Sequence, residues 1–423
     1  MKITLIVISI LLFASGLKAQ EHTSSMAAKS FGDDVRLLTE HTDATVLRNG
    51  NAAILVVPEY QGRVMTATAR GDEGLSSGWI NDKLVKQGVV SEERAKGSLD
   101  EHMYAFGGEE RFWMGPEGGQ YSIFFAPGKA FEFENWFTPD PIDNQPWTVV
   151  SKTDRSIELS HDFSLRNHAG NEFQVAAKRT VELLDRKQAS RLLGGTIADP
   201  IDWVAYRSSN TVTNRGDTAW TKDTGLLSIW MLCMFQPSPT TTVFVPFKPS
   251  EAGKLGEAGK LGRIVADDYF GKIPQDRLKI SGGVVYFKCD GKQRGKIGFS
   301  PERATGIAGS YDPLIGRLTL LVYRPPESHN GYVNSKWEFQ DQPYVGDAIN
   351  SYNDGPVDDS GEQMGPFYEL ESSSPALALE PGESATHTQT VTHLYGDREQ
   401  LQTVVRRVCD VDLDEVAGAF NDQ

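Results

Sequence analysis

Short β-type segments separated by turn residues follow one another along most of this 423-residue chain. In "ATVLRNGNAAILVVP", Asn49-Gly50 lies between two apolar runs, which is the strongest short-range signal for a β-hairpin. Helical patterns occur only around residues 91–105 and after residue 396. Because no Pro/Ser-rich linker divides the chain, we expect one large all-β domain. Periodicity alone leaves open whether it is a pair of packed sheets, a barrel or a propeller.

The N-terminal segment "MKITLIVISILLFASGLKAQ" has one Lys, an apolar run and then small residues, which is the pattern of a secretory signal peptide. The apolar run from Ile3 to Phe13 is shorter than the roughly 20 residues that a membrane helix needs, and no Cys follows it to accept a lipid. We therefore expect a periplasmic or secreted protein without a membrane anchor. The expected organisation is a signal peptide at 1–19, a linker at 20–35, the β domain at 36–396 and a helical tail at 397–423.

Composition excludes several classes of function. The formal net charge is −15, whereas nucleic acid or an anionic membrane surface as partner would need basic patches. Three cysteines, Cys233, Cys289 and Cys409, cannot form a disulfide framework. The sequence has no serine-hydrolase elbow, zinc-protease motif, Cys-x-x-Cys, Walker loop or dinucleotide fingerprint. We assign no cofactor.

The segment "GGEERFWMGPEGGQYSIFF" at residues 107–125 is the first candidate site. Its two glycine pairs permit positive φ and close backbone approach, which indicates sharp turns around a short exposed stretch. Arg111 offers a planar fork of donors, and Trp113 offers a face that can stack on a sugar ring. In the alternative interpretation, Trp113 belongs to the core and Arg111 pairs with one of the acids of the segment, among them Glu109 and Glu117.

Glu369 and Glu371 form the second candidate site. Because a strand alternates its faces, these two side chains point the same way, roughly 7 Å apart. Two acids on one face seldom belong in a core. They can instead be solvent-facing charges on an outer sheet.

Three blocks, taken in order, resemble the galactose mutarotase-like superfamily of aldose 1-epimerase type. "ILVVPEYQGRVMTATARG" resembles its early strand pair, and "YELESSSPALALEPGESATHTQTVTHLY" resembles its closing unit. Between them, "GG", "RFW" and "GPE" of residues 107–117 resemble the sugar-site segment of secreted relatives. The resemblance implies a β-supersandwich, in which two large antiparallel sheets pack face to face and the concave side binds carbohydrate.

The resemblance also implies roles for some residues. A Glu on the closing strand would be the general base, and we favour Glu371 over Glu369. The family's general acid is a His at a strand start in mid-chain, but the comparable stretch "SSNTVTNRGDTAW" has none. Among the remaining histidines, His102 and His329 are best placed. This departure puts mutarotase activity in doubt.

The region "KWEFQDQPYVGDAINSYNDGPVDDSGEQMGPF" is rich in oxygen ligands, among them Asn353 and Asp354. Such side chains can hydrogen-bond sugar hydroxyls or hold Ca²⁺, but the pattern is not that of an EF-hand, and Asn-Asp-Gly is also a turn signal. We assign no metal. Two hypotheses remain for the whole chain: a sugar epimerase or glycoside-processing enzyme, and a non-catalytic carbohydrate-binding protein.

Overall fold

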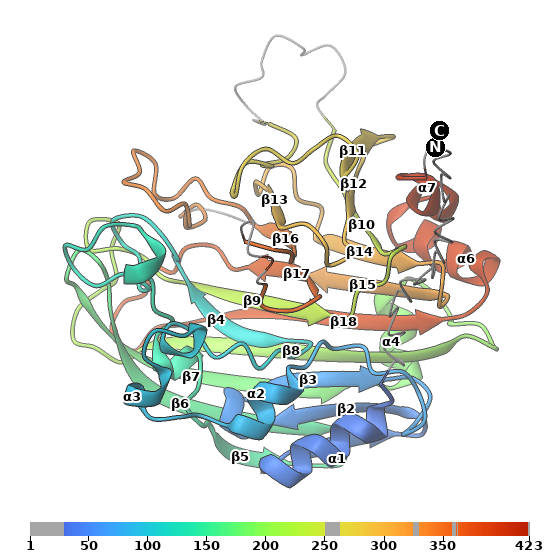
Figure 1. The fold of residues 1–423 in the computed structure, drawn as a ribbon, viewed down its shortest axis with the longest axis horizontal. Coiled ribbons are helices and arrows are strands. Elements are labelled where there is room, and N and C mark those ends of the chain that lie inside the picture. The colour runs from blue at the N-terminus through green and yellow to red at the C-terminus, as the bar shows by residue number, and fades with distance from the viewer. Residues whose placement is uncertain (1–28, 250–262, 325–329, 358–360, 362, 422–423) are drawn as a thin grey trace, which may run out of the picture.

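The computed structural model describes residues 29–249, 263–324, 330–357, 361 and 363–421, and its ribbon is shown in Figure 1. The expected signal peptide, most of the expected linker and His329 lie outside these residues. The described chain is mostly β, with two antiparallel layers and short helices near its C-terminus, which confirms the fold class predicted from the sequence. No helix among the described residues is long and apolar enough to span a bilayer.

The first layer is a ten-stranded antiparallel sheet that runs along the lower and right-hand parts of Figure 1. Its strands, in spatial order, are β11 (Leu278–Ser281), β12 (Val284–Lys288), β10 (Thr242–Pro246), β14 (Ile307–Asp312), β15 (Arg317–Tyr323), β18 (Ser384–Tyr395), β8 (Asp202–Asn214), β7 (Glu172–Leu183), β6 (Ser156–Arg166) and β5 (Thr148–Lys152).

The second layer combines a five-stranded and a three-stranded sheet. The five strands are β13 (Gly295–Phe299), β16 (Ile349–Asn353), β17 (Tyr368–Ser373), β9 (Ser228–Phe235) and β4 (Arg111–Gly115). The three strands are β1 (Thr45–Asn49), β2 (Ala52–Val57) and β3 (Arg63–Thr68). An isolated bridge between Val64 and Glu110 joins β3 to the start of β4. The turn between β1 and β2 holds Gly50 at positive φ, which confirms the predicted Asn-Gly hairpin.

Helices lie around these layers. They are α1 (Phe31–His41), α2 (Asp82–Gln87), α3 (Glu92–Ala95), α4 (Arg186–Leu192), α6 (Arg398–Cys409) and α7 (Leu413–Gly418), with 3-10 turns η1 (Pro58–Tyr60), η2 (Leu99–Glu101), η3 (Phe133–Asn135) and η4 (Asp140–Ile142). Helix α1 begins with a capping box made by Ser30 and Asp33, so it runs across the boundary that we expected between residues 35 and 36.

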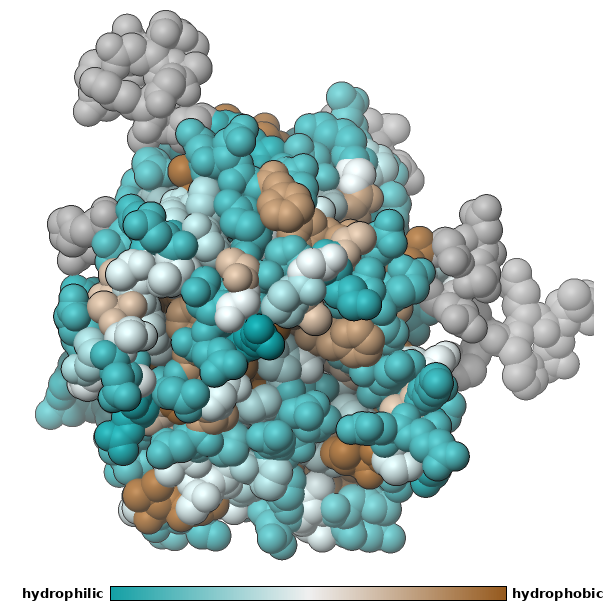
Figure 2. Space-filling model, turned by 90° about the vertical axis from the view of Figure 1, so that its left-hand side faces the viewer, coloured by the Kyte–Doolittle hydropathy of each residue, from teal (hydrophilic) through white to brown (hydrophobic). Residues whose placement is uncertain are grey.

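The C-terminal helices pack against the side of the ten-stranded sheet that faces away from the second layer. Leu401 and Val405 of α6 belong to the same buried cluster as Leu318 and Leu320 of β15. The neighbouring Thr319 instead belongs to a buried polar network with Glu109 and His393. On the molecular side shown in Figure 2, the surface is mostly hydrophilic, with hydrophobic residues in scattered groups. The buried apolar surface therefore lies between the two layers and under α6 and α7.

A buried ion pair connects the two layers. The Arg179 guanidinium on β7 lies 2.5 Å from a carboxylate oxygen of Glu110, and neither side chain is exposed. Arg179 also donates to the Gly62 carbonyl and to Asn210. The second oxygen of Glu110 accepts hydrogen bonds from Ser208 and Gln389, on β8 and β18. These contacts attach the start of β4 to three strands of the ten-stranded sheet.

We predict that Arg179→Met lowers the free energy of unfolding by about 3–5 kcal/mol, because it leaves the Glu110 carboxylate buried without its cation. Lys178→Met is the matched control on the same strand. Lys178 points to the opposite face and pairs with Glu158 while 54% exposed, so its loss should cost less than about 1 kcal/mol. Urea unfolding of both variants measures the difference. Equal losses would mean that the buried pair does not hold the layers together.

Candidate functional site

The outer face of the five-stranded sheet carries a row of large and charged side chains. Cross-strand partners in an antiparallel sheet share a face, and the register pairs Trp113 with Trp230, Arg111 with Leu232, and Tyr352 with both Lys296 and Glu369. The opposite face packs on the ten-stranded sheet, where Tyr368 bonds Ser310. The residues that share the outer face are Arg111, Trp113, Trp230, Leu232, Lys296, Asn350, Tyr352, Glu369 and Glu371.

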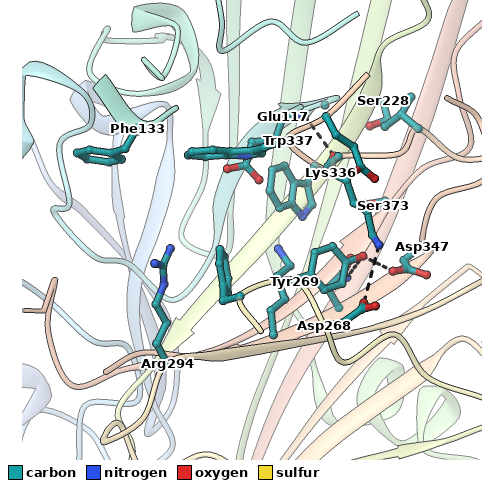
Figure 3. Close-up of a pocket in the computed structure, with 18 of the residues that line it drawn as sticks. Glu117, Phe133, Ser228, Asp268, Tyr269, Arg294, Lys336, Trp337, Asp347 and Ser373 are labelled. Atoms are coloured by element: carbon teal, nitrogen blue, oxygen red, sulfur yellow. Dashed lines mark hydrogen bonds and ion pairs between the residues drawn. The ribbon is translucent and has the colours of Figure 1, made fainter. Parts of the chain in front are cut away.

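A cavity lies over this face. Its main chamber has a volume of about 420 Å³ and its side chamber about 120 Å³. Loop residues that close the main chamber include Glu117, Asp268, Tyr269, Lys336 and Trp337. Figure 3 shows the Tyr269 hydroxyl directed at Asp347 and the Lys336 ammonium directed at Asp268. The two chambers share Glu117, Phe133, Trp230, Phe270, Arg294, Lys296 and Trp337, so they form one continuous site.

Two ion pairs lie at the floor of the cavity. An Nη of Arg111 donates to Glu369 over 2.9 Å, and Nζ of Lys296 donates to Glu371 over 2.9 Å. The Trp230 indole donates to the same Glu371 oxygen over 3.0 Å. The Lys296 ammonium also lies 4.8 Å from the centre of the Trp230 ring. Each cation is thus matched by a carboxylate in a nearly water-free setting.

The two glutamates of β17 differ in access to the cavity. Glu369 lines the side chamber, whereas Glu371 is fully buried beneath Lys296 and Trp230 and lines neither chamber. Glu371 as the catalytic base stays a prediction, and its carboxylate does not face the cavity. The alternation of side chains along β17 correctly predicted that Glu369 and Glu371 share a face. It could not predict that Lys296, on another strand, covers Glu371.

The two carboxyl groups that line the side chamber, Glu117 and Glu369, both have raised pKa values. Burial raises the pKa of Glu369 to about 7, and the charge of Glu371 adds to this rise, while Arg111 opposes it. Burial also raises the pKa of Glu117, which the charge of Lys296 opposes. Both groups line the side chamber. With a pKa of about 7, the Glu369 carboxyl can take up and release a proton at physiological pH.

Trp113 has a mainly structural environment. Only 3% of it is exposed, and the Arg111 guanidinium lies 4.2 Å from its ring centre. Its other neighbours include Phe124, Trp136 and Trp230. Although Trp113 borders the side chamber, little of its face is free to stack on a sugar. This agrees with the alternative interpretation of Trp113 as core.

Four other predicted site residues do not line the cavity. Glu109 lies between the layers, 2.7 Å from His393. Asn353 and Asp354 hold turns, since Asn353 bonds the backbone at Gln293 and Asp354 accepts from Tyr352 and Gly365. His102 bonds the Trp136 carbonyl and stacks on Phe137. The four assignments stay predictions, but each of these side chains is engaged in contacts outside the cavity. No group of three His, Cys, Asp or Glu side chains suited to a metal occurs among the described residues.

Several cavity residues were missed by sequence reasoning: Trp230, Tyr269, Arg294 and Lys296. One signal existed for Lys296, because "GKIGF" places a Lys within a short, otherwise apolar strand. Arg294 and Tyr269 lie in loops, and no local pattern marks them.

The glycine pairs adopt the predicted turn conformations in part, but the stretch between them is buried and not exposed as we expected. Gly107, Gly108 and Gly119 have positive φ, and a Cβ at Gly118 would overlap the backbone of Lys336. The glycine at 118 therefore lets the loop that carries Glu117 approach the opposite wall closely.

A family model described as Family of unknown function (DUF6786) matches residues 29–420. No curated protein matches the chain. Similar solved structures include a candidate aldose 1-epimerase of Escherichia coli K12, at 14% identity and TM-score 0.48, covering 84% of this chain and 99% of that chain.

The Slr1438 protein from Synechocystis sp. PCC 6803 is 12% identical, with TM-score 0.49 and coverage of 84% and 96% of the two chains. A galactose mutarotase-like protein from Lactobacillus casei ATCC 334 is 11% identical, with TM-score 0.46 and coverage of 83% and 99%. All three TM-scores lie below 0.5 and all three identities below 25%, so no role of this chain follows from these matches.

The raised pKa of Glu369 predicts a specific dependence of stability on pH. The folded state holds this proton more tightly than the unfolded chain, whose ordinary value is 4.5. The resulting stability is fully present below about pH 4.5 and is lost as the pH rises through about 7. Relative to the parent protein, Glu369→Gln should therefore gain up to about 3 kcal/mol of unfolding free energy between these pH values. Urea unfolding at several pH values measures the gain, with exposed Glu73→Gln as control. A gain that does not change with pH would contradict the assignment.

Proposed function

We propose that this chain, which belongs to the DUF6786 family of unknown function, binds a saccharide in the cavity and acts on it by proton transfer. One observation carries the proposal. Glu117 and Glu369 line the same chamber, and burial raises the pKa of both carboxyls. Pairs of carboxyls tuned in this way are the usual apparatus for acid–base chemistry on sugars.

The lining of the cavity supports a saccharide as ligand. Its main chamber of about 420 Å³ falls in the range of small-molecule sites. Trp337 and Phe270 offer apolar faces for a sugar ring, while Ser228 and Ser373 offer hydroxyl groups for its hydroxyls. The resemblance to galactose mutarotase-like proteins favours the same ligand class.

The two carboxyls would have different roles. Glu369 receives a hydrogen bond from Arg111, which holds the carboxylate in one orientation and stabilises its ionised form. It is therefore the better general base towards a sugar hydroxyl. Glu117 is the other carboxyl that lines the side chamber, and burial raises its pKa as well; we assign it the role of general acid in place of the family's His. This division of roles suits either an anomeric epimerisation or the cleavage of a glycosidic bond.

A non-catalytic carbohydrate-binding protein remains the second candidate. One observation favours it: no His lines either chamber among the described residues. The two candidates differ in the fate of the bound sugar, because only the enzyme changes it. The signal-peptide pattern at residues 1–19 leads us to propose that the saccharide is encountered in the periplasm or outside the cell.

The proposed function is tested by a panel of monosaccharides and oligosaccharides. Binding is measured by quenching of tryptophan fluorescence, and the anomeric protons of each bound sugar are followed by NMR. We expect at least one sugar to bind and its anomeric signals to exchange or change faster with protein than without. Glu369→Gln and Glu117→Gln should each lower this rate by about 10²- to 10⁴-fold, while binding persists.

Glu134→Gln is the control for this test, because it changes an exposed carboxyl that is next to Phe133 in the sequence and lines neither chamber. Its effect on the rate should be much smaller. Binding without any change in the sugar would favour the binding-protein alternative. The absence of binding across the panel would contradict the proposed function.

The two tryptophans Trp337 and Trp113 should respond differently to substitution. Trp337 is only partly buried and lines both chambers. Trp337→Ala should therefore weaken saccharide binding by about tenfold or more, with a small change in thermal midpoint. Trp113→Ala should lower stability by about 3–5 kcal/mol, because it leaves a cavity in the core. Titration calorimetry and thermal unfolding of both variants measure the contrast, and the reverse pattern would contradict it.

A further inference from the structure

The cationic side chains that line the cavity are not all paired. Four occur in its described lining: Arg111, Lys296, Lys336 and Arg294. The first three lie within 4.0 Å of a carboxylate oxygen. No described residue accepts a hydrogen bond from Arg294 or forms an ion pair with it, and its Nε is buried without a partner. The cavity therefore contains one guanidinium whose donors are available to a ligand.

Packing holds this guanidinium in place. Arg294 immediately precedes β13, and its guanidinium carbon lies 3.9 Å from the centre of the Phe270 ring. A ring stacked on one face of a guanidinium restrains its plane but leaves the N–H groups at its edge free. Figure 3 shows the side chain extending into the cavity towards the side that carries Phe133. The donors thus point into space that a ligand can occupy.

The nearest acids do not neutralise Arg294. Its charge acts on Glu117 and Asp354 only over distances longer than an ion pair. Burial raises the pKa of both of these carboxyls, and neither of them forms an ion pair with Arg294. A partly buried cation without an acceptor is unfavourable, and an incoming anion would relieve this cost.

We propose that the ligand is an acidic saccharide, one that carries a carboxylate or a sulfate group, and that Arg294 binds this group. The inference rests on the proposed function and narrows its substrate class. The planar fork of an Arg matches such anions through two parallel hydrogen bonds. Because Arg294 lines both chambers, an anion bound there would fix the sugar beside Glu117 and Glu369.

Matched pairs of sugars test this proposal. Glucuronate is compared with glucose, galacturonate with galactose, and galactose 6-sulfate with galactose, as free sugars and as short oligosaccharides where these exist. We expect at least one acidic member to bind about tenfold to hundredfold more tightly than its neutral partner, the effect of a charged hydrogen bond. The preference should shrink as salt rises. Preference for the uronates identifies a carboxylate, and preference for the sulfate ester identifies a sulfate.

Substitutions at and near position 294 test whether Arg294 causes the tighter binding of acidic sugars. Arg294→Gln should abolish it while leaving the affinity for the neutral sugar nearly unchanged, and Arg294→Lys should retain part of it. Lys292→Gln, which removes the same charge from an exposed position two residues away, should retain all of it. Thermal unfolding checks that each variant folds. If Arg294→Gln does not fold, the proposal is still tested on the parent protein. A preference for the acidic sugar that shrinks as salt rises supports it, and equal binding of acidic and neutral sugars contradicts it.

Two outcomes would overturn the proposal. One is equal binding of acidic and neutral sugars by the parent protein, which leaves the proposed function intact. The other is a preference that survives in folded Arg294→Gln. If no sugar of either kind binds, the proposed function fails, and this inference fails with it.

Discussion

The buried pair between Arg179 and Glu110 fixes the strand on which the cavity depends. Glu110 points between the layers, where it is bonded to strands β7, β8 and β18. The next residue, Arg111, points outward because a strand alternates its faces. Anchoring one therefore sets the position of the other, and Arg111 in turn holds the Glu369 carboxylate. The most desolvated charges of the core thus determine the geometry of a site on the opposite face of the sheet.

Charge balance explains how the floor of the cavity remains stable while its carboxyls stay reactive. Lys296 is fixed by Glu371 below it and by the rings of Trp230 and Tyr269 beside it. Its positive charge opposes the effect of burial on Glu369. Without such cations, burial would keep the carboxyl protonated and unable to act as a base. Glu371 therefore holds Lys296 in place and lines neither chamber itself.

The sequence predicted local and repeating features better than side-chain access. The Asn49-Gly50 turn was enough to predict a hairpin, and the alternation of side chains along a strand was enough to place Glu369 and Glu371 on one face. Both predictions succeed because they depend on local backbone geometry. The choice between these two acids depended on Lys296, which lies over 70 residues away on another strand. Likewise, Glu109 looked available in its glycine-rich segment but meets His393, a partner 284 residues distant. Contacts of such sequence separation leave no local pattern.

Two arginines that line the cavity, Arg111 and Arg294, differ in whether a carboxylate already pairs with them. Arg111 is already bonded to Glu369, so an anion that bound Arg111 would compete with the carboxylate and release it from its orientation. Arg294 has no such partner among the described residues, and it lines the same side chamber as Glu117 and Glu369. An acidic sugar held by Arg294 would leave the Arg111–Glu369 pair intact. Binding of the ligand and tuning of the base can thus proceed through different cations, and neither function weakens the other.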